Sequence, residues 1–376
     1  MSVLSLPLGE LFQIEYGAAL KADARDASGE WDVFGSAGPV GRHSDALVKE
    51  PMIVVGRKGS VGKLTLAECG GWPIDTTFYM VPKRGRDISL RYAFHMLSRI
   101  SLDHLTITTS IPGLNRNDLA AVKIPVPGMN EQRRIAAILD KADAIRRKRQ
   151  QALALADDFL RSAFLEMFGA PVANPRGWNW CPIEAVVASI DAGWSAKGLD
   201  RPANFDELGV LKISAVTSGR YRPNENKAVE IVEAGRPLVM PQKGDLLFSR
   251  ANTRELVAAA CIVDRTVENV FLPDKLWRIR LKPQCATPEY LKFVLSDPTF
   301  RAGLCAKATG TSGSMLNISQ GKLLETALPL PLIDQQQAFS RLFWRMAGTR
   351  AQLVEQSEND NTLFASLSQR AFRGEL

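Results

Sequence analysis

The chain contains an internal repeat, and this repeat limits the architectures that it can adopt. Ile124-Pro125-Val126-Pro127 recurs as Leu328-Pro329-Leu330-Pro331, at an offset of 204 residues (328 − 124). At the same offset, Asn130-Glu131-Gln132 matches Asp334-Gln335-Gln336. Each copy predicts a strand that the prolines end, followed by a helix with Asn or Asp as its N-cap. We therefore expect two similar halves, each with its own strand-to-helix connection.

The two predicted helices carry the spacing of a coiled-coil seam, with apolar residues at alternating steps of three and four. The seam positions are Ile135, Ile138, Ile145 and Phe159 in the first helix, and Phe339, Leu342, Leu353 and Leu363 in the second. Polar residues interrupt both seams, among them Arg149 and Asp360, which we expect to pair across the helices. Residues 131–168 alone would span roughly 57 Å at about 1.5 Å per residue. The alternative is a pair of ordinary core helices.

The segments before the helices also correspond, although more loosely. Asp75–Met80 resembles Asp274–Ile279, and Tyr92–Ser98 matches Tyr290–Ser296 as a short helix. The sequences between these landmarks diverge, which indicates similar scaffolds with different surfaces. A turn-rich segment around 168–178 separates the halves.

We therefore predict an α+β fold in which two mixed α/β domains are separated by two long helices that form an antiparallel coiled coil. The predicted boundaries are 1–123 and 171–327 for the domains, and 124–170 and 328–376 for the helices. Antiparallel helices would relate the two domains by a pseudo-two-fold axis. Because DNA strands are themselves related by two-fold axes, this arrangement suits a bipartite DNA site.

Composition and charge narrow the class of protein. The 47 Lys and Arg residues exceed the 40 Asp and Glu residues, and this net charge of +7 favours an anionic partner. The five cysteines form no CxxC pair, which argues against a disulfide framework or a zinc module and suits a reducing compartment. We expect no secretion signal, and no apolar run approaches the roughly 18 residues of a membrane helix. We expect a cytoplasmic protein without a membrane segment.

The sequence offers no catalytic motif. Five residues separate Gly56 from Gly62 and Leu64 follows Lys63, so this glycine-rich loop is not a P-loop. The three histidines lack metal-ligand spacing, and neither a nucleophile elbow nor the Asn/Asp-Pro-Pro-aromatic loop of amino methyltransferases is present. We expect no metal, no bound cofactor and no enzymatic activity of this chain.

Two basic loops are candidates for nucleic-acid contact. Residues 56–63 combine three cations, a hydroxyl and three glycines, and glycine lets a backbone approach a ligand closely. Residues 249–254 follow a buried apolar run and contain Arg and Asn, the side chains that read guanine and adenine. The alternative for both is a turn with solvated charges. Gly310–Ser314 and Thr108–Ser110 offer donors for phosphate, and the run Arg146–Arg149 suits a solvated face, a phosphate stripe or an acidic partner.

Several of these features together resemble the specificity subunits of Type I restriction–modification enzymes. They are the duplicated strand-to-helix motif, the boundary around 169–178, and the segments 31–41, 54–62 and 243–250. The resemblance covers essentially the whole chain. It implies two target-recognition domains that each read one half of an interrupted DNA sequence, with the two helices as the spacer between them.

The resemblance also implies partners and contact residues. The helices would dock two methyltransferase subunits, which bind S-adenosylmethionine and methylate adenine N6, and two motor-nuclease subunits would join in a restriction complex of the prokaryotic cytoplasm. The candidate DNA-binding residues are Ser36, Arg42, Arg57, Lys58, Ser60, Lys63 and Thr76 in the first domain, and Arg220, Arg222, Arg250, Asn252, Thr253, Arg254 and Lys275 in the second. The alternatives are a helical docking scaffold without DNA readout and an autonomous DNA methyltransferase.

Overall fold

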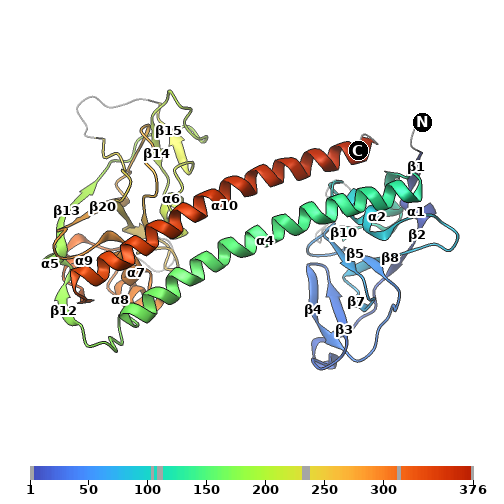
Figure 1. Cartoon of the computed structure of the whole chain (residues 1–376), viewed down its shortest axis with the longest axis horizontal. Coiled ribbons are helices and arrows are strands. Elements are labelled where there is room, and N and C mark those ends of the chain that lie inside the picture. The colour runs from blue at the N-terminus through green and yellow to red at the C-terminus, as the bar shows by residue number, and fades with distance from the viewer. Residues whose placement is uncertain (1–3, 103–105, 108–112, 231–237, 311–314, 374–376) are drawn as a thin grey trace. The chain divides into compact units, whose positions relative to one another are not determined.

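The computed structural model describes the chain except for residues 1–3, 103–105, 108–112, 231–237, 311–314 and 374–376. The chain divides into two compact units. Unit 1 comprises residues 1–151 and 355–376, and unit 2 comprises residues 152–354. Each unit holds one mixed domain and a part of each of two long helices (Figure 1).

The domain of unit 1, domain 1, is built from short strands and helices. In chain order these are β1 (Ser5–Pro7), α1 (Leu8–Leu11), β2 (Phe12–Tyr16), η1 (Ala22–Ala24), β3 (Trp31–Gly35), β4 (Gly38–His43), β5 (Met52–Gly56), β6 (Leu64–Ala67), β7 (Trp72–Pro73), β8 (Thr77–Pro82), α2 (Leu90–Leu97), β9 (Thr106–Ile107), β10 (Gly113–Leu114), α3 (Arg116–Ala121) and β11 (Lys123–Pro125). They form sheets of order β2-β8-β5-β6 and β4-β3-β7 and the pairs β1-β11 and β9-β10.

The domain of unit 2, domain 2, follows the same plan. Its elements are β12 (Asn179–Pro182), α5 (Ile183–Val186), β13 (Val187–Ala192), β14 (Gly209–Leu211), α6 (Ser214–Thr217), β15 (Asn226–Ala228), β16 (Leu246–Ser249), β17 (Ala251–Asn252), β18 (Ala260–Ile262), β19 (Val270–Phe271), β20 (Leu276–Leu281), α7 (Pro288–Ser296), α8 (Pro298–Ala306), β21 (Leu316–Asn317), α9 (Gln320–Leu324) and β22 (Ala327–Leu330). Its sheets have the orders β13-β20-β16-β18 and β15-β14-β19, with the pairs β12-β22 and β17-β21.

The predicted repeat is confirmed strand by strand. β5 lies between β8 and β6, both antiparallel to it, as β16 lies between β20 and β18. β3 pairs antiparallel with β4 and parallel with β7, as β14 pairs with β15 and β19. β5 and β16 are buried at every residue, because a central strand covered on both faces needs a continuous apolar run. Both domains therefore contain the same two sheets.

The two long helices are α4 (Met129–Phe168, 40 residues) and α10 (Ile333–Arg373, 41 residues). They begin one residue before Asn130 and Asp334, so these residues lie in the first turn and the N-cap prediction was wrong. The reason is that the helical hydrogen bonds begin before these residues. The Gln132 amide donates to the Gly128 carbonyl, and the Gln336 amide donates to the Leu332 carbonyl.

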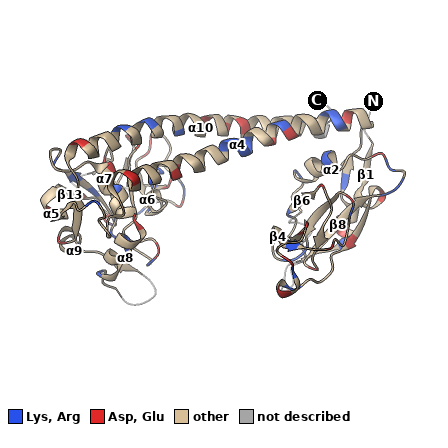
Figure 2. Ribbon diagram, turned by 60° about the horizontal axis from the view of Figure 1, so that its bottom comes forward, with Lys and Arg blue, Asp and Glu red and all other residues tan. Residues whose placement is uncertain are grey.

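Within each unit the helices pack antiparallel, as predicted. In unit 1 the Arg149 Nη1 atom lies 2.6 Å from Asp360 Oδ2 and donates to the Gln356 carbonyl at 2.7 Å. The contact with Asp360 is a charge contact without hydrogen-bond alignment, since the aligned bond goes to the carbonyl. In unit 2 the rings of Phe164 and Phe339 lie 5.5 Å apart. Charges of both signs lie along both helices (Figure 2).

A fully buried glutamine in the first turn of each long helix joins the helix to its domain. The Gln132 Oε1 atom accepts from the Ser89 amide at 2.8 Å, and its Nε2 atom donates to the carbonyls of Asp87 and Pro127, both at 2.9 Å. In domain 2, Gln336 makes the corresponding bonds to the Thr287 amide and to the carbonyls of Cys285 and Pro331. The prolines that end each strand thus also supply the carbonyl that holds the helix.

A buried tyrosine reinforces each of these junctions. The Tyr92 hydroxyl donates to the Pro125 carbonyl at 2.8 Å, and the Tyr290 hydroxyl donates to the Pro329 carbonyl at 2.5 Å. Burial raises the pKa of both phenols well above the usual value, so both remain neutral donors. The first turn of α2 is therefore fixed to β11, the strand before α4, and the first turn of α7 is fixed to β22, the strand before α10.

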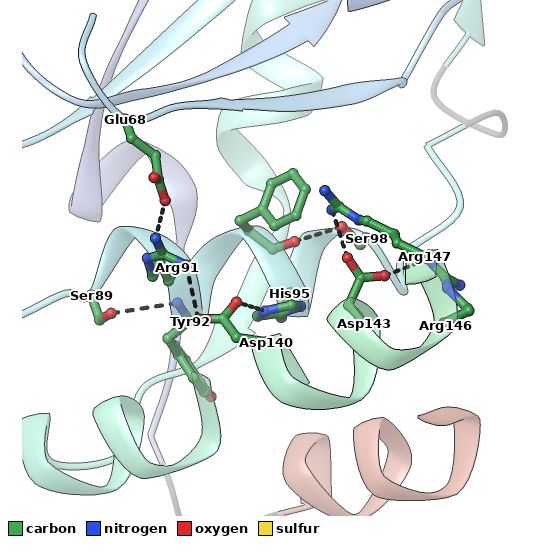
Figure 3. A network of polar contacts seen from close by, with 11 residues as sticks. Glu68, Ser89, Arg91, Tyr92, His95, Ser98, Asp140, Asp143, Arg146 and Arg147 are labelled. Carbon is green, nitrogen blue, oxygen red and sulfur yellow. Dashed lines mark hydrogen bonds and ion pairs between the residues drawn. The ribbon is translucent and has the colours of Figure 1, made fainter. Parts of the chain in front are cut away.

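Surrounding polar contacts differ between the two junctions. In domain 1, Arg91 lies between Glu68 and Asp140, and His95 Nε2 lies 2.7 Å from Asp140 Oδ1 (Figure 3). In domain 2 the Glu289 carboxylate instead accepts from the Ser340 hydroxyl at 2.7 Å and from Trp344 Nε1 at 2.6 Å. The glutamine and tyrosine bonds are common to both halves, whereas the surrounding polar contacts differ between them.

We predict that Gln132→Ala and Gln336→Ala each destabilise their own unit by roughly 2–4 kcal/mol, because every buried polar partner left unpaired costs about 1–3 kcal/mol. In urea unfolding monitored by hydrogen–deuterium exchange, protection of the backbone amides should be lost first in residues 87–92 for Gln132→Ala and in residues 285–290 for Gln336→Ala. Gln335→Ala, at an exposed position of the same helix, is the control and should change stability by no more than about 0.5 kcal/mol. Equal stability of Gln336→Ala and Gln335→Ala would contradict this role.

We also predict a coupling energy of about 1 kcal/mol between Arg149 and Asp360 in a double-mutant cycle with Arg149→Gln and Asp360→Asn. Both side chains are partly buried, at 27% and 21% exposed, so the coupling should decrease but persist in high salt. The exposed Lys148, replaced by Gln in a parallel cycle with Asp360→Asn, should show no coupling. A coupling of zero for Arg149 would mean that the ion pair does not stabilise the helices.

Candidate nucleic-acid interface

In domain 1 the candidate site begins where the central strand β5 ends. The Arg57 amide donates to the Thr76 carbonyl at 2.9 Å, and the Arg57 carbonyl accepts from the Leu114 amide at 3.0 Å. The guanidinium donates from Nη1 to the Asp75 carbonyl at 3.0 Å and lies 5.9 Å from the centroid of the Phe78 ring. Backbone contacts therefore fix both the main chain and the side chain of this arginine.

The loop from Arg57 to Lys63 joins β5 and β6 as a hairpin and depends on its glycines. Gly59 and Gly62 have positive φ angles of 78° and 74°, which residues with a Cβ rarely adopt. A Cβ on Gly56 would lie 2.0 Å from the Ser60 carbonyl oxygen, so the backbone at Ser60 packs directly against Gly56 at the start of the loop. Within this loop Lys58, Ser60 and Lys63 are exposed, and the Ser36 hydroxyl lies beside Gly59. The loop presents two ammonium groups and hydroxyls on a backbone fixed by glycine.

Domain 2 places Arg250 in the equivalent position, at the end of β16. Its amide donates to the Lys275 carbonyl at 3.1 Å, and its carbonyl accepts from the Ile318 amide at 2.8 Å. The guanidinium donates from Nε to the Asp274 carbonyl at 2.8 Å and lies 5.8 Å from the Trp277 ring centroid. These four contacts match those of Arg57 one by one.

The two arginines differ in charge compensation. Arg250 Nη2 lies 3.8 Å from the Asp274 carboxylate, and Nη1 donates to Asn317 Oδ1 at 3.0 Å. Among the residues that the structure describes, no carboxylate lies within ion-pair distance of Arg57. The positive charge at the end of β5 is therefore less compensated than the charge at the end of β16.

The other predicted contact residues lie in different settings. Thr253, Arg254 and Arg222 are exposed, Asn252 is in the short strand β17, and Thr76 and Lys275 are partly buried beside the two arginines. Two candidates have their charge engaged within the protein: Arg220 forms an ion pair with Asp157 of α4, and Arg42 lies 3.6 Å from Asp32. Thr108–Ser110 and 311–314 lie outside the described residues.

The predicted seam residues are unequally covered. Ile135 and Phe339 are fully buried, while Ile138, Leu342 and Leu353 are partly buried. Ile145, Phe159 and Leu363 remain about half exposed, at 48%, 48% and 55%. The chain by itself therefore leaves apolar side chains uncovered along both helices.

Sequence reasoning missed two residues beside Arg57. Tyr16, at the end of β2, lies 5.1 Å by ring centroid from the Arg57 guanidinium, and Arg116, at the start of α3, lies 5.7 Å from the same ring. No local pattern marks either residue, because the order β2-β8-β5 of the sheet brings Tyr16 to Arg57 and the packing of α3 against β2 brings Arg116 there. The aromatic contacts of Arg57 and Arg250 with Phe78 and Trp277 were missed for the same reason.

Two further findings concern the whole described part of the chain. Among its described residues there is no group of three or more His, Cys, Asp or Glu side chains placed to hold a metal ion. In the same residues, every helix is too short or too polar to cross a membrane.

Comparison with known proteins shows which proteins this chain is similar to. Residues 5–155 match the family model of the Type I restriction modification DNA specificity domain. The chain is 35% identical over 162 residues to the Type I restriction enzyme EcoEI specificity subunit of Escherichia coli, a match that covers 43% of this chain and 27% of that one. It is 26% identical over 306 residues to the EcoKI specificity subunit of Escherichia coli strain K12, covering 74% and 63% of the two chains.

The matched parts of the chain are therefore similar to Type I restriction enzyme specificity subunits, as the sequence predicted, and the chain spans less than two thirds of the length of these two relatives. Its fold is that of the S subunit of a Type I restriction–modification system from M. genitalium. The two structures superimpose with a TM-score of 0.66 over 99% of this chain and 96% of the other, at 14% sequence identity.

Proposed function

We propose that this chain is the non-catalytic DNA-reading subunit of a Type I restriction–modification complex and that each domain reads one half of an interrupted sequence. The observation that carries the proposal is the pair of equivalent arginines, Arg57 and Arg250, in duplicated domains. Each guanidinium is held by a backbone carbonyl and an aromatic ring. Two arginines fixed in the same way suit two readers of one duplex.

The chemistry of the surrounding residues supports this proposal. A guanidinium can bind the O6 and N7 atoms of guanine through two hydrogen bonds in the major groove. Because the side chain is already held in place, less conformational entropy is lost when it binds. The exposed Lys58, Lys63 and Arg254 are suited to phosphates, which fix the register of a protein on DNA but carry no sequence information.

We further propose that α4 and α10 set the distance between the half-sites and dock two methyltransferase subunits, with motor-nuclease subunits joining in a restricting complex. The half-exposed Ile145, Phe159 and Leu363 support docking, since a partner could cover them. In this proposal S-adenosylmethionine binds to the partners and not to this chain, and the complex acts in the cytoplasm. A docking scaffold without DNA readout is the second candidate, because the same exposed residues would serve it.

We predict that Arg57→Ala relaxes base preference in one half-site only and that Arg250→Ala relaxes it in the other. The expected loss of discrimination at one position is about 1–3 kcal/mol, the range of one bidentate guanine contact. The measurement is genome-wide mapping of methylated adenines in cells that co-express each variant with the cognate methyltransferase subunit.

The controls for this experiment are Arg84→Ala and Arg265→Ala, which remove exposed arginines of the same domains away from the two strand ends. Both should leave the methylated motif unchanged. If either Arg57→Ala or Arg250→Ala altered both half-sites, the two-reader model would be wrong. A soluble complex that adds no methylation in the presence of this chain would favour the docking scaffold.

Lengthening the long helix tests the spacer. We predict that four residues inserted into α4 between Leu153 and Phe159 change the preferred number of base pairs between the half-sites while both half-site sequences stay the same. The control is a four-residue insertion after Gly85, in an exposed turn of domain 1 where a Cβ would meet no atom within 4 Å. Methylation mapping measures the spacer length of the methylated motif for both variants. An unchanged spacer in the α4 variant would mean that the helices do not set the distance.

A further inference from the structure

Tyr16 brings two arginines together at the edge of domain 1. Its side chain is half exposed, at 50%, and its ring packs against Phe78 at 4.9 Å between centroids. The guanidinium groups of Arg57 and Arg116 lie 5.1 Å and 5.7 Å from the Tyr16 ring centroid. Such a contact stabilises an exposed cation by about 0.5–1 kcal/mol. One exposed ring therefore holds two positive charges, which we call the Tyr16 cluster (Tyr16, Arg57 and Arg116).

The Tyr16 cluster carries more positive than negative charge. Arg116 Nη1 lies 3.6 Å from Glu15 Oε2, a loose and exposed ion pair, and no carboxylate among the described residues is paired with Arg57. The exposed Lys58 follows Arg57 directly in the loop. Two guanidinium groups on the same ring repel each other, and an anion bound beside them would remove that repulsion. The cluster is thus charged and exposed in the way that suits an anionic ligand.

Domain 2 lacks this cluster, although it keeps the equivalent arginine. Tyr16 pairs with Phe78 in the register of β2 and β8, and in β13 and β20 the residue paired with Trp277 is Ala192. Ala192 is exposed and offers no ring. At this register position domain 2 therefore has no ring that corresponds to Tyr16.

The residue of domain 2 at the position equivalent to Arg116 is neutral. Asn115 caps α3 and Ser319 caps α9, so the first residue of each helix corresponds, and Gln320 takes the place of Arg116. The buried Leu119 and Leu323 follow at the same distance and confirm this alignment. The two halves thus share the reader arginine and differ in the cation next to it.

We propose that Arg116, held on Tyr16 beside Arg57, binds a phosphate of the DNA backbone next to the base that Arg57 reads. The half-site read by domain 1 is then bound more tightly and with a steeper salt dependence than the half-site read by domain 2. This inference rests on the proposed function and adds that the two half-sites are bound with different affinity and salt dependence. Arg116 contributes affinity and not base preference, since phosphate contacts carry no sequence information.

The test is Arg116→Gln, which gives domain 1 the side chain that domain 2 has. Binding of the complete complex with its methyltransferase subunits is measured by fluorescence anisotropy on duplexes that vary either half-site, from about 50 to 200 mM salt. One lost phosphate contact should reduce the slope of log K against log salt by about 0.9 and lower affinity roughly five- to tenfold at about 0.1 M salt. The loss should be equal on all base variants of the first half-site, and the preferred bases should not change.

Three further variants separate a phosphate contact from a structural role. Arg116→Lys keeps the charge and should keep the slope, and Gln320→Ala, at the equivalent exposed position of domain 2, should change nothing. The double substitution Ala192→Tyr with Gln320→Arg should raise the slope by about 0.9, because it adds the missing cation and its ring. This gain cannot come from unfolding, so the inference remains testable if Arg116→Gln is unstable.

Each alternative outcome has a distinct meaning. An unchanged slope for Arg116→Gln, with the same melting temperature as the wild type, would refute the phosphate contact and leave the reading function intact. A changed base preference would make Arg116 a base reader and would also refute it. A wild-type complex whose affinity depended on neither salt nor sequence would refute the proposed function itself.

Discussion

The junction between each domain and its long helix depends on a buried glutamine amide. Apolar contacts hold surfaces together but have little directional preference, so they do not by themselves fix the angle at which a 40-residue helix leaves a sheet. An amide that must satisfy one donor and two acceptors without water can do so in one geometry. Gln132 and Gln336 are both fully buried and bond to matching groups. The placement of each candidate reader site relative to its helix depends on this constraint.

The duplicated scaffold explains how two halves can diverge and still hold an arginine in the same place. Arg57 and Arg250 are held mainly by backbone groups, namely the carbonyls of Asp75 and Asp274 and the ladder bonds at the strand ends. Backbone groups persist whatever side chain is present, so neighbouring side chains can change without displacing the arginine. The contrast between Tyr16 and Ala192, which occupy the same register position, is an example. In the proposed function, backbone geometry shared by the two domains, combined with different side chains, would let each domain read a different half-site.

The sequence predicted the features that depend on local patterns or on the repeat offset. The strands before the helices, the duplicated α+β plan and the Arg149–Asp360 contact all belong to this class, because heptad spacing and a constant offset are visible along the chain. The Tyr16 cluster was not predictable, since the order of strands in the sheet and the packing of α3 against β2 bring its residues together. Neither was the ion pair of Arg220 with Asp157, because a basic turn reveals neither the direction of its side chains nor their partners. Sheet order and side-chain direction are tertiary properties, and a single sequence contains no local signal for them.

The exposed apolar residues of α4 and α10 follow from the geometry of a helix pair. Two helices bury one stripe on each other, and residues at the margins of that stripe keep part of their surface in water. Ile145, Phe159 and Leu363 are each about half exposed, and charges of both signs lie along the same two helices (Figure 2). The charges favour solubility, whereas apolar surface covered by a partner would contribute roughly 25 cal/mol per Å² before the entropic cost of association is subtracted. In the proposed complex, the helices that join the reader domains therefore also have the surface from which partner docking gains free energy.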